Sequence, residues 1–275
     1  MTSPDGKTWS KFNRLSTIVG GSYQISIAKP GKAATCFDYH PKSVCNDRTN
    51  LYYLETTDFG KTWQTADGTS VELPLTEVNN PALVHDYQAE NLLVYIKDIR
   101  LDEQNRPILL YTTSKGYDSG PQNDPRIWWT ARWTGEKWDI LPAMRSGNNY
   151  DMGPLYLRPD GSWQIIAPTE LGPQPYNTGG EVAMWFSTDL GNHWTKTRQM
   201  TRNSPWNHSF VRQPVNAHPE FYAFWADGHS RQPSGSNLYF SDIEGNVYRL
   251  PQEMKADFEK PQPAPCVGTA KTYDK

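Results

Sequence analysis

Short runs of alternating, β-branched and aromatic residues recur along the chain, separated by clusters of Gly, Pro, Asn and Asp. A period of two, with turn residues at both ends, is typical of β-strands. The pattern predicts strands in groups of three, at 22–28, 33–40 and 50–56, at 92–101, 107–114 and 127–133, at 153–159, 162–169 and 181–188, and at 209–215, 221–228 and 236–242. No long helix is predicted.

A turn sequence is repeated between the strand groups. It reads SPDGKTW at 3–9, TTDFGKTW at 56–63 and STDLGNHW at 187–194, with weaker copies TGEKW at 134–138 and SDIEGNVY at 241–248. The closing aromatic residues are 54, 75, 56 and 54 positions apart: Trp9, Trp63, Trp138, Trp194 and Tyr248. This spacing predicts one four-stranded sheet per repeat, with residues 64–90 as an insertion that lengthens one interval.

The composition of the repeated turn indicates a structural role. We expect the Asp carboxylate to accept backbone N–H groups, the Gly to adopt a positive φ and the Trp to pack beneath the loop. We therefore interpret Asp5, Asp58 and Asp189 as turn residues and not as catalytic carboxylates.

Composition and charge narrow the possible partners. The chain has 35 aromatic residues and 42 Gly or Pro residues among 275, which suits short strands joined by many turns. The net charge of −3 provides no basic field, so nucleic acid is not an expected partner. No apolar run approaches the roughly 20 residues that span a bilayer, and the polar N-terminus does not resemble a signal peptide.

The repeated turn resembles the Asp-box, or BNR, repeat of sialidase-like β-propellers. Segments 47–63, 148–156, 167–185 and 207–228 further resemble a bacterial BNR-repeat family related to ulvan lyases and to enzymes that cleave rhamnosyl–glucuronate linkages. The resemblance covers about residues 1–250. It implies an all-β fold, a β-propeller of four-stranded blades with a box turn in each.

The number of blades leaves three interpretations open. The repeats account for about four and a half blades, whereas those relatives have seven, and a propeller with an open ring exposes sheet edges. An N-terminally truncated seven-bladed propeller is favoured over a five-bladed closure or an arc completed by another chain. We expect a single partial propeller domain over 1–251 and a loosely attached tail over 252–275.

The family resemblance implies a secreted polysaccharide lyase, extracellular or periplasmic, acting on a uronate-containing polysaccharide of the rhamnose–glucuronate type. In such a β-elimination a base removes the C5 proton of the uronate, its carboxylate is neutralised, and an acid protonates the leaving oxygen. A glycoside hydrolase on the same scaffold and a non-catalytic glycan-binding or structural propeller are the alternatives. No cofactor is required, although calcium or zinc would suit a lyase.

Histidine, tyrosine and arginine supply the candidate site. His40 and His208 are candidate acid–base residues because a neutral imidazole exchanges a proton near pH 7, and each has an arginine nearby. Tyr150 is the candidate proton shuttle. If 207–212 is a strand, the spacing of His208 and Arg212 places both on one face. The expected substrate-binding residues are Tyr39, Arg48, Asn149, Tyr176, Arg212 and His218, with a hydrogen-bonded structural role as the alternative for each.

Carboxylates and cysteines leave further alternatives. A hydrolase would draw a carboxylate pair from Asp38, Asp151, Glu170, Glu181 and Asp227. Three cysteines (Cys36, Cys45 and Cys266) are too few for a disulfide framework, so buried thiols and a Cys36–Cys45 bridge both remain open. The group Cys36, His40 and Cys45 lacks a convincing fourth zinc ligand, and no metal site is predicted.

Overall fold

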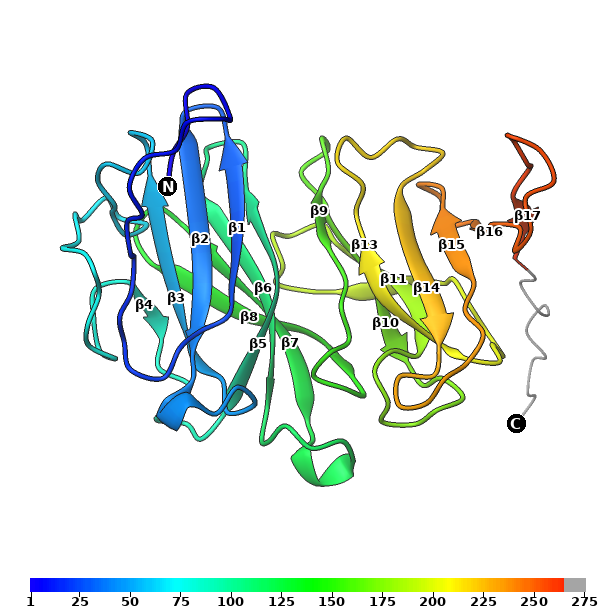
Figure 1. Cartoon of the computed structure of the whole chain (residues 1–275). Helices are drawn as coiled ribbons and strands as arrows, with labels where there is room; N and C mark the ends of the chain where they lie inside the picture. The colour runs from blue at the N-terminus through cyan, green and yellow to red at the C-terminus, as the bar shows by residue number, and fades with distance from the viewer. Residues whose placement is uncertain (265–275) are drawn as a thin grey trace. The chain divides into compact units, whose positions relative to one another are not determined.

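The structure is a computed structural model that describes residues 1–264. These residues form seventeen strands and two short 3-10 turns, η1 (Pro41–Ser43) and η2 (Pro121–Asn123), and contain no α-helix (Figure 1). All twelve strands predicted from the sequence are present. The described chain is therefore all-β, as the sequence indicates, and none of its helical turns is long or apolar enough to cross a membrane.

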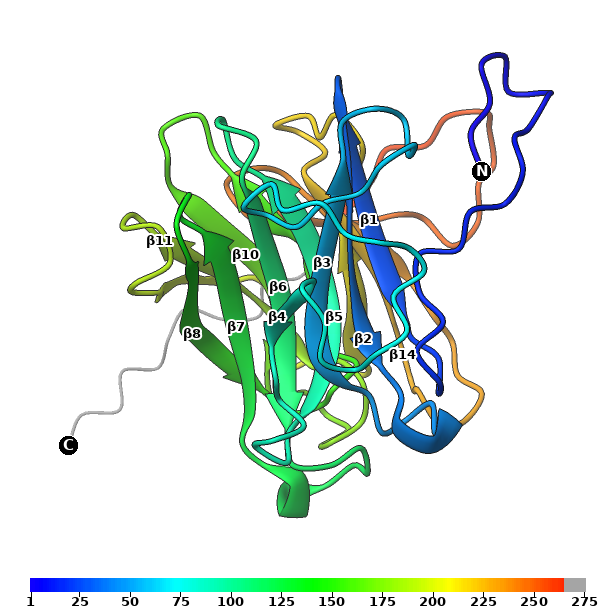
Figure 2. The same cartoon turned by 90° about the vertical axis from the view of Figure 1, so that its left-hand side faces the viewer.

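The strands form four sheets, each built from consecutive antiparallel strands. The first two sheets, seen from a second side in Figure 2, consist of β1 (Gln24–Lys29), β2 (Lys32–Tyr39), β3 (Thr49–Thr56) and β4 (Leu83–His85), and of β5 (Leu93–Leu101), β6 (Pro107–Ser114), β7 (Arg126–Trp133) and β8 (Trp138–Ser146). The other two consist of β9 (Leu155–Leu157), β10 (Trp163–Glu170), β11 (Glu181–Ser187) and β12 (Thr195–Gln199), and of β13 (Asn207–Arg212), β14 (Ala223–Gly228), β15 (Leu238–Ser241), β16 (Val247–Arg249) and β17 (Gln262–Pro263).

Each sheet is one blade of a β-propeller, because a blade is a sheet of four consecutive antiparallel strands, to which the last blade adds the two-residue strand β17. The fourth strand of each blade escaped the sequence pattern. In β12 (TKTRQ) the side chains are exposed or half-buried, so no alternation marks it. In the first blade the fourth strand, β4, comes from the inserted segment 64–90.

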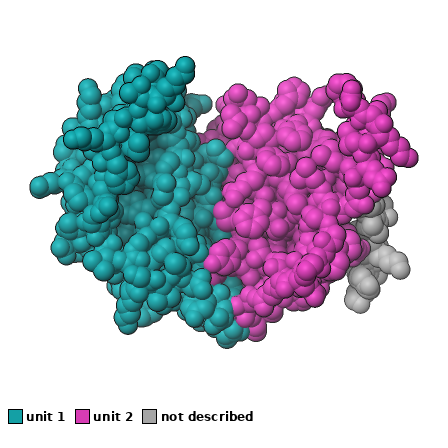
Figure 3. All heavy atoms as spheres, in the orientation of Figure 1, with its two compact units in different colours: residues 1–118, 122–142 teal, residues 119–121, 143–275 magenta. Residues whose placement is uncertain are grey.

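The chain divides into two compact units, shown in separate colours in Figure 3. Unit 1 comprises residues 1–118 and 122–142 and holds the first two blades, apart from the end of β8. Unit 2 comprises residues 119–121 and 143–275 and holds the other two. The single domain over 1–251 and the loose tail over 252–275 stay predictions.

Strand β3 shows how unit 1 builds its core. All of its residues are buried because both faces are covered. Leu51 and Tyr53 pack with Cys36 of β2 against side chains of the second blade. Tyr52 and Leu54 face the other way and pack against Leu75 and Ala82 of the insertion. Each large apolar side chain buried in this way stabilises the fold by about 1.5–3 kcal/mol.

The repeated turns have the hydrogen bonds that the sequence predicts for them. Asp58 accepts the N–H groups of Lys61 and Thr62 at 3.0 Å, and Asp189 accepts that of His193 at 2.9 Å. The following glycine in each turn, Gly60 or Gly191, has a positive φ. These N–H donors lower the pKa of both carboxyl groups to about 2. The carboxylates are therefore occupied in bonds within their own turns, which is a structural role.

Candidate functional site

A group of polar and aromatic side chains gathers where β2 ends and β3 begins. His40 directly follows β2, and Arg48 directly precedes β3. The segment before β1 folds back onto them: Tyr23 N–H donates to Asp38 Oδ1 at 2.6 Å, Asp38 N–H donates to the Tyr23 carbonyl at 3.1 Å, and His40 N–H donates to the Gly21 carbonyl at 3.0 Å. The backbone therefore fixes Asp38, His40 and Tyr23 relative to one another.

The fit between this segment and β2 depends on Gly20. Its φ is +131°, a value that L side chains rarely adopt, and a Cβ at this position would lie 2.0 Å from the His40 carbonyl oxygen. Only glycine allows the backbone to pass so close to His40. The close contact between Gly20 and the His40 carbonyl therefore helps to fix the backbone that carries the His40 ring.

Two buried polar atoms of this group lack hydrogen bonds. Asp38 and His40 are 1% and 4% exposed, and neither Asp38 Oδ2 nor His40 Nε2 has a hydrogen-bond partner within residues 1–264. His40 Nε2 lies 3.0 Å from Asp38 Oδ1, but the angle is not that of a hydrogen bond. Buried polar groups are normally paired, and an unpaired one costs about 1–3 kcal/mol. Such a pair of atoms is a candidate for chemistry.

Burial also moves the protonation equilibria of these two side chains. Desolvation raises the pKa of Asp38 to about 7, although the backbone N–H of Tyr23 and the charge of Arg48 partly oppose it. Desolvation, followed by the charge of Arg48, lowers the pKa of His40 below its usual 6.5. Near neutral pH His40 is therefore an uncharged imidazole and Asp38 exchanges its proton readily.

Arg48 is held by two tyrosine rings. Its guanidinium carbon lies 4.3 Å from the ring centre of Tyr23 and 4.3 Å from that of Tyr95 at the start of β5. Its Nε donates to the Cys45 carbonyl at 3.2 Å. The Tyr23 ring also packs against His40, with the ring centres 4.7 Å apart. Stacking fixes the plane of the guanidinium, which suits it to bind a carboxylate through two parallel hydrogen bonds.

The structure thus brings His40 and Arg48 to one place, with Asp38 beside them. The Tyr39 ring packs instead against the cluster that contains Phe37 and Tyr52. Tyr23 and Tyr95 were missed by the sequence analysis. The GGSY sequence at 20–23 contains a hint, because paired glycines before a strand indicate a close approach of backbone. Nothing in the sequence indicates that Tyr95, 47 residues after Arg48, would stack on it.

A second group of the predicted residues lies in unit 2. Asp151 is fully buried and accepts the N–H groups of Asn148 and Gly179 at 2.8 and 2.7 Å. The Asn148 amide donates to the Tyr176 carbonyl at 2.7 Å. These bonds tie the segment that carries Asn149 and Tyr150 to the loop that carries Tyr176.

His208 lies in a closed hydrogen-bond network. Its Nδ1 accepts the indole N–H of Trp225 at 2.9 Å, and its Nε2 lies 2.8 Å from Ser204 Oγ. The neutral ring therefore carries its proton on Nε2 and donates it to Ser204, whose hydroxyl donates to Glu181 at 2.9 Å. Burial lowers the pKa of His208, although the charges of Glu181 and Asp227 oppose this shift. This environment is that of a structural histidine with both ring nitrogens occupied.

The prediction that His208 and Arg212 share a face of their strand is wrong. The register of β13 shifts between Ser209 and Arg212, so that His208 pairs with Asp227 and Arg212 pairs with Phe224. Asp227 and Phe224 are three residues apart on β14, so their side chains point to opposite faces of the sheet. The side chains of His208 and Arg212, which pair with them, therefore also point to opposite faces. Arg212 is also exposed at the far end of β13, followed by the loop that contains His218, so neither joins His208.

Part of the chain matches a known protein family. Residues 16–145, which include the Asp38–His40–Arg48 group, match the model of a family described as BNR repeat-containing. The resemblance to the BNR-repeat family is confirmed. The sequence matches no curated protein.

Three solved structures of polysaccharide lyases are similar in fold to this chain. A PL25 ulvan lyase matches with a TM-score of 0.64 at 15% identity, covering 87% of this chain and 57% of its own. The same kind of lyase bound to -[GlcA(1-4)Rha3S]- matches with a TM-score of 0.62 at 15% identity and the same coverage. The lyase Uly1 matches with a TM-score of 0.57 at 12% identity, covering 87% and 51%. The chain thus spans a little over half the length of these lyases, and the likeness concerns the fold.

The other candidate carboxylates have structural partners. Glu181 accepts the Ser204 N–H at 2.8 Å, Asp227 accepts the Asn237 N–H at 2.6 Å, and Glu170 pairs with Lys196 at 2.9 Å. Together with Asp151, they hold loops of unit 2. Asp38 alone among the five candidates keeps a buried oxygen without a hydrogen bond in the described residues.

Two of the three cysteines are free thiols, so there is no Cys36–Cys45 bridge. Cys36 is buried in the core of unit 1 and Cys45 is exposed in the loop before β3, and both are free. Burial and the charges of Asp98 and Asp38 raise the pKa of the Cys36 thiol. Cys266 lies outside the described residues. Within residues 1–264 no cluster of three or more His, Cys, Asp and Glu side chains is arranged to hold a metal ion.

Proposed function

We propose that this protein cleaves a uronate-containing polysaccharide of the rhamnose–glucuronate type by β-elimination, with the reaction centre at the end of β2 in unit 1. The observation that carries the proposal is the buried His40 Nε2, without a hydrogen bond within residues 1–264, beside Asp38 and near a guanidinium that stacks on two aromatic rings. A base next to a fixed carboxylate-binding cation is what the elimination requires.

Arg48 is the proposed carboxylate clamp. A uronate becomes acidic at C5 only when its carboxylate is neutralised, because negative charge develops on that group as the proton leaves. The guanidinium is always charged, and its plane is fixed by Tyr23 and Tyr95. The half-exposed Tyr23 ring also offers a surface on which a sugar can stack.

His40 is the proposed base. In the elimination its ring takes the C5 proton, the C–H electron pair forms the C4–C5 double bond, and the C4–O bond breaks. Asp38 Oδ1, 3.0 Å from Nε2, then stabilises the imidazolium. Tyr23, whose half-exposed ring packs against both His40 and Arg48, is the proposed acid for the leaving oxygen, while Tyr150 remains a separate prediction in unit 2.

Two further observations support the substrate class. A lyase of the same fold has been solved with an oligosaccharide containing GlcA and Rha3S. The residues of unit 1 that surround the group match a BNR repeat-containing family. Because a polysaccharide substrate would be met outside the cytoplasm, the location that goes with this proposal is the extracellular space or the periplasm.

The test is incubation of the full chain with a panel of uronate-containing polysaccharides, following ultraviolet absorbance and reducing ends in parallel. Elimination raises both, because it leaves a double bond conjugated to the carboxylate. Reducing ends without absorbance would replace the lyase proposal with a hydrolase. No change in either, with binding retained, would leave a glycan-binding propeller.

The matched variants are His40→Ala and His193→Ala. Loss of a general base lowers the rate about 10²–10⁴-fold, so we expect that loss for His40→Ala. His193 lies exposed in the turn of another blade, and its replacement should leave turnover unchanged. Full activity of a folded His40→Ala protein would remove His40 from the mechanism.

A further inference from the structure

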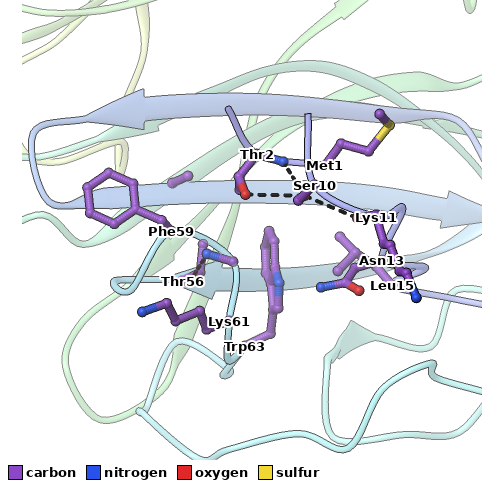
Figure 4. Close-up of a pocket in the computed structure, with 12 residues that line it drawn as sticks. Met1, Thr2, Ser10, Lys11, Asn13, Leu15, Thr56, Phe59, Lys61 and Trp63 are labelled. Carbon is purple, nitrogen blue, oxygen red and sulfur yellow. Dashed lines mark hydrogen bonds between the residues drawn. The ribbon is translucent and has the colours of Figure 1, made fainter. Parts of the chain in front are cut away.

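A cavity of about 560 Å³ lies at the other end of the first blade. It is bordered by Ala33 near the start of β2 and Thr56 at the end of β3, whereas His40 and Arg48 lie at the opposite ends of these strands. Residues 1–15 form one wall (Figure 4). This cavity is therefore separate from the proposed reaction centre.

Hydrogen bonds hold the N-terminal wall in place. Thr2 N–H donates to Ser10 Oγ at 2.8 Å, and Ser10 N–H donates to the Thr2 carbonyl at 2.8 Å, which closes a loop. Leu75 N–H donates to the Leu15 carbonyl at 2.9 Å and joins this wall to the insertion. The cavity thus has a defined shape on both sides.

The lining combines an aromatic face with unpaired donors. The Trp63 ring stands in the cavity, with Asn13 on one side of it and Lys61 and Phe59 on the other (Figure 4). Phe59 is 84% exposed, which is unusual for so large an apolar side chain. Across residues 1–264, nothing pairs with Nζ of Lys11 or Lys61 or with the side-chain amide of Asn13.

The charge of the lining selects the ligand. Two lysines and no acidic residue are found among the twelve described residues that border the cavity. An anionic group is therefore favoured. An aromatic face beside amide and ammonium donors matches a sugar ring that carries hydroxyl groups and an acidic group.

We infer that this cavity is a second binding site for an acidic oligosaccharide. One sugar ring stacks on Trp63, acidic groups of the chain pair with Lys11 on one side of this ring and with Lys61 on the other, and Asn13 binds hydroxyl groups. The choice of a uronate chain as the ligand rests on the proposed function, but the site does not involve His40 or Arg48. It would hold the polymer at a distance from the reaction centre.

The experiment is a calorimetric titration of the full chain with a uronate oligosaccharide. The background is the double variant His40→Ala/Arg48→Gln, which removes the base and the cation of the other site. We expect binding to persist in this background. Adding Lys11→Gln and Lys61→Gln should weaken it at least about tenfold, equivalent to ~1.4 kcal/mol, and the affinity should fall as salt is added.

Lys7→Gln with Lys137→Gln is the matched control, because it removes the same charge from two exposed lysines that do not line the cavity. An equal loss in this control, unchanged binding in the Lys11/Lys61 variant, or equally tight binding of a neutral oligosaccharide would each overturn the inference. The Lys11/Lys61 variant in the otherwise native chain should still cleave short oligosaccharides. Binding without cleavage in the native chain would instead overturn the proposed function alone.

Discussion

Replacing Asp38 by Asn should abolish one component of the pH dependence of stability. The folded-state pKa of Asp38 is raised to about 7 by burial, against an ordinary value of 3.8. The native protein therefore binds this proton more tightly than the unfolded chain does. The free energy of unfolding should fall as pH rises from about 4 through about 7, and remain level above that.

The size of the effect follows from the two pKa values. Acidification from pH 7.5 to pH 5 should stabilise the native state by about 2.5 kcal/mol through Asp38, since each unit of pKa difference corresponds to about 1.36 kcal/mol. An Asn side chain does not titrate, yet its oxygen can keep the bond from Tyr23 N–H. The variant should therefore lack this gain while remaining folded.

The assay is denaturant unfolding at pH 5.0, 6.0 and 7.5, followed by probes that separate the two units, because two units need not unfold together. Asp58→Asn is the control. Hydrogen bonds from the turn lower the pKa of Asp58 to about 2, so its ionisation state does not change in this range. The same pH dependence in the native chain and in Asp38→Asn would refute the reasoning.

Four other outcomes are expected. The rate constant kcat/KM should fall as the pH drops below about 7, because Asp38, whose pKa is about 7, must be ionised to stabilise the imidazolium, whereas His40, whose pKa is lowered, is already neutral there; a pH–rate profile that is flat between pH 7.5 and pH 5 would contradict the pairing of these two residues. Arg48→Lys keeps the charge but loses the stacked plane, so KM for a uronate oligosaccharide should rise about tenfold or more in steady-state kinetics, whereas an unchanged KM would exclude the clamp. Gly20→Ala should lower turnover through its clash with the His40 carbonyl, while Gly31→Ala, which has open space, should cost only about 1 kcal/mol of strain in a thermal unfolding measurement. His208→Ala should destabilise unit 2 by about 2–4 kcal/mol, because it leaves Trp225 and Ser204 without their partner; a fully stable variant in the same measurement would count against a structural His208.

Individual residues of the candidate site could be predicted from the sequence. His40 and Arg48 stand out because both residue types flank a loop between two strands, and the structure brings them together. For His208 and Arg212, by contrast, the spacing in the sequence led to a wrong prediction. The strand contains a register shift after Ser209, and the sequence SFVR has no glycine or proline that would mark it. A bulge moves each later side chain of the strand to the other face of the sheet, so a shift of one residue in register changes which side chains share a face.

The sequence by itself determined the all-β class, the four-sheet organisation and the structural role of the turn carboxylates, because strand alternation and turn chemistry act between residues close in the chain. Only the tertiary structure decided which polar groups are left unpaired. His40 and His208 have similar sequence settings, yet packing leaves Nε2 of one without a hydrogen bond and closes both nitrogens of the other. The stacking of Tyr23 and Tyr95 on Arg48 and the raised pKa of Asp38 likewise depend on burial and on neighbours distant in the chain, which no local pattern specifies.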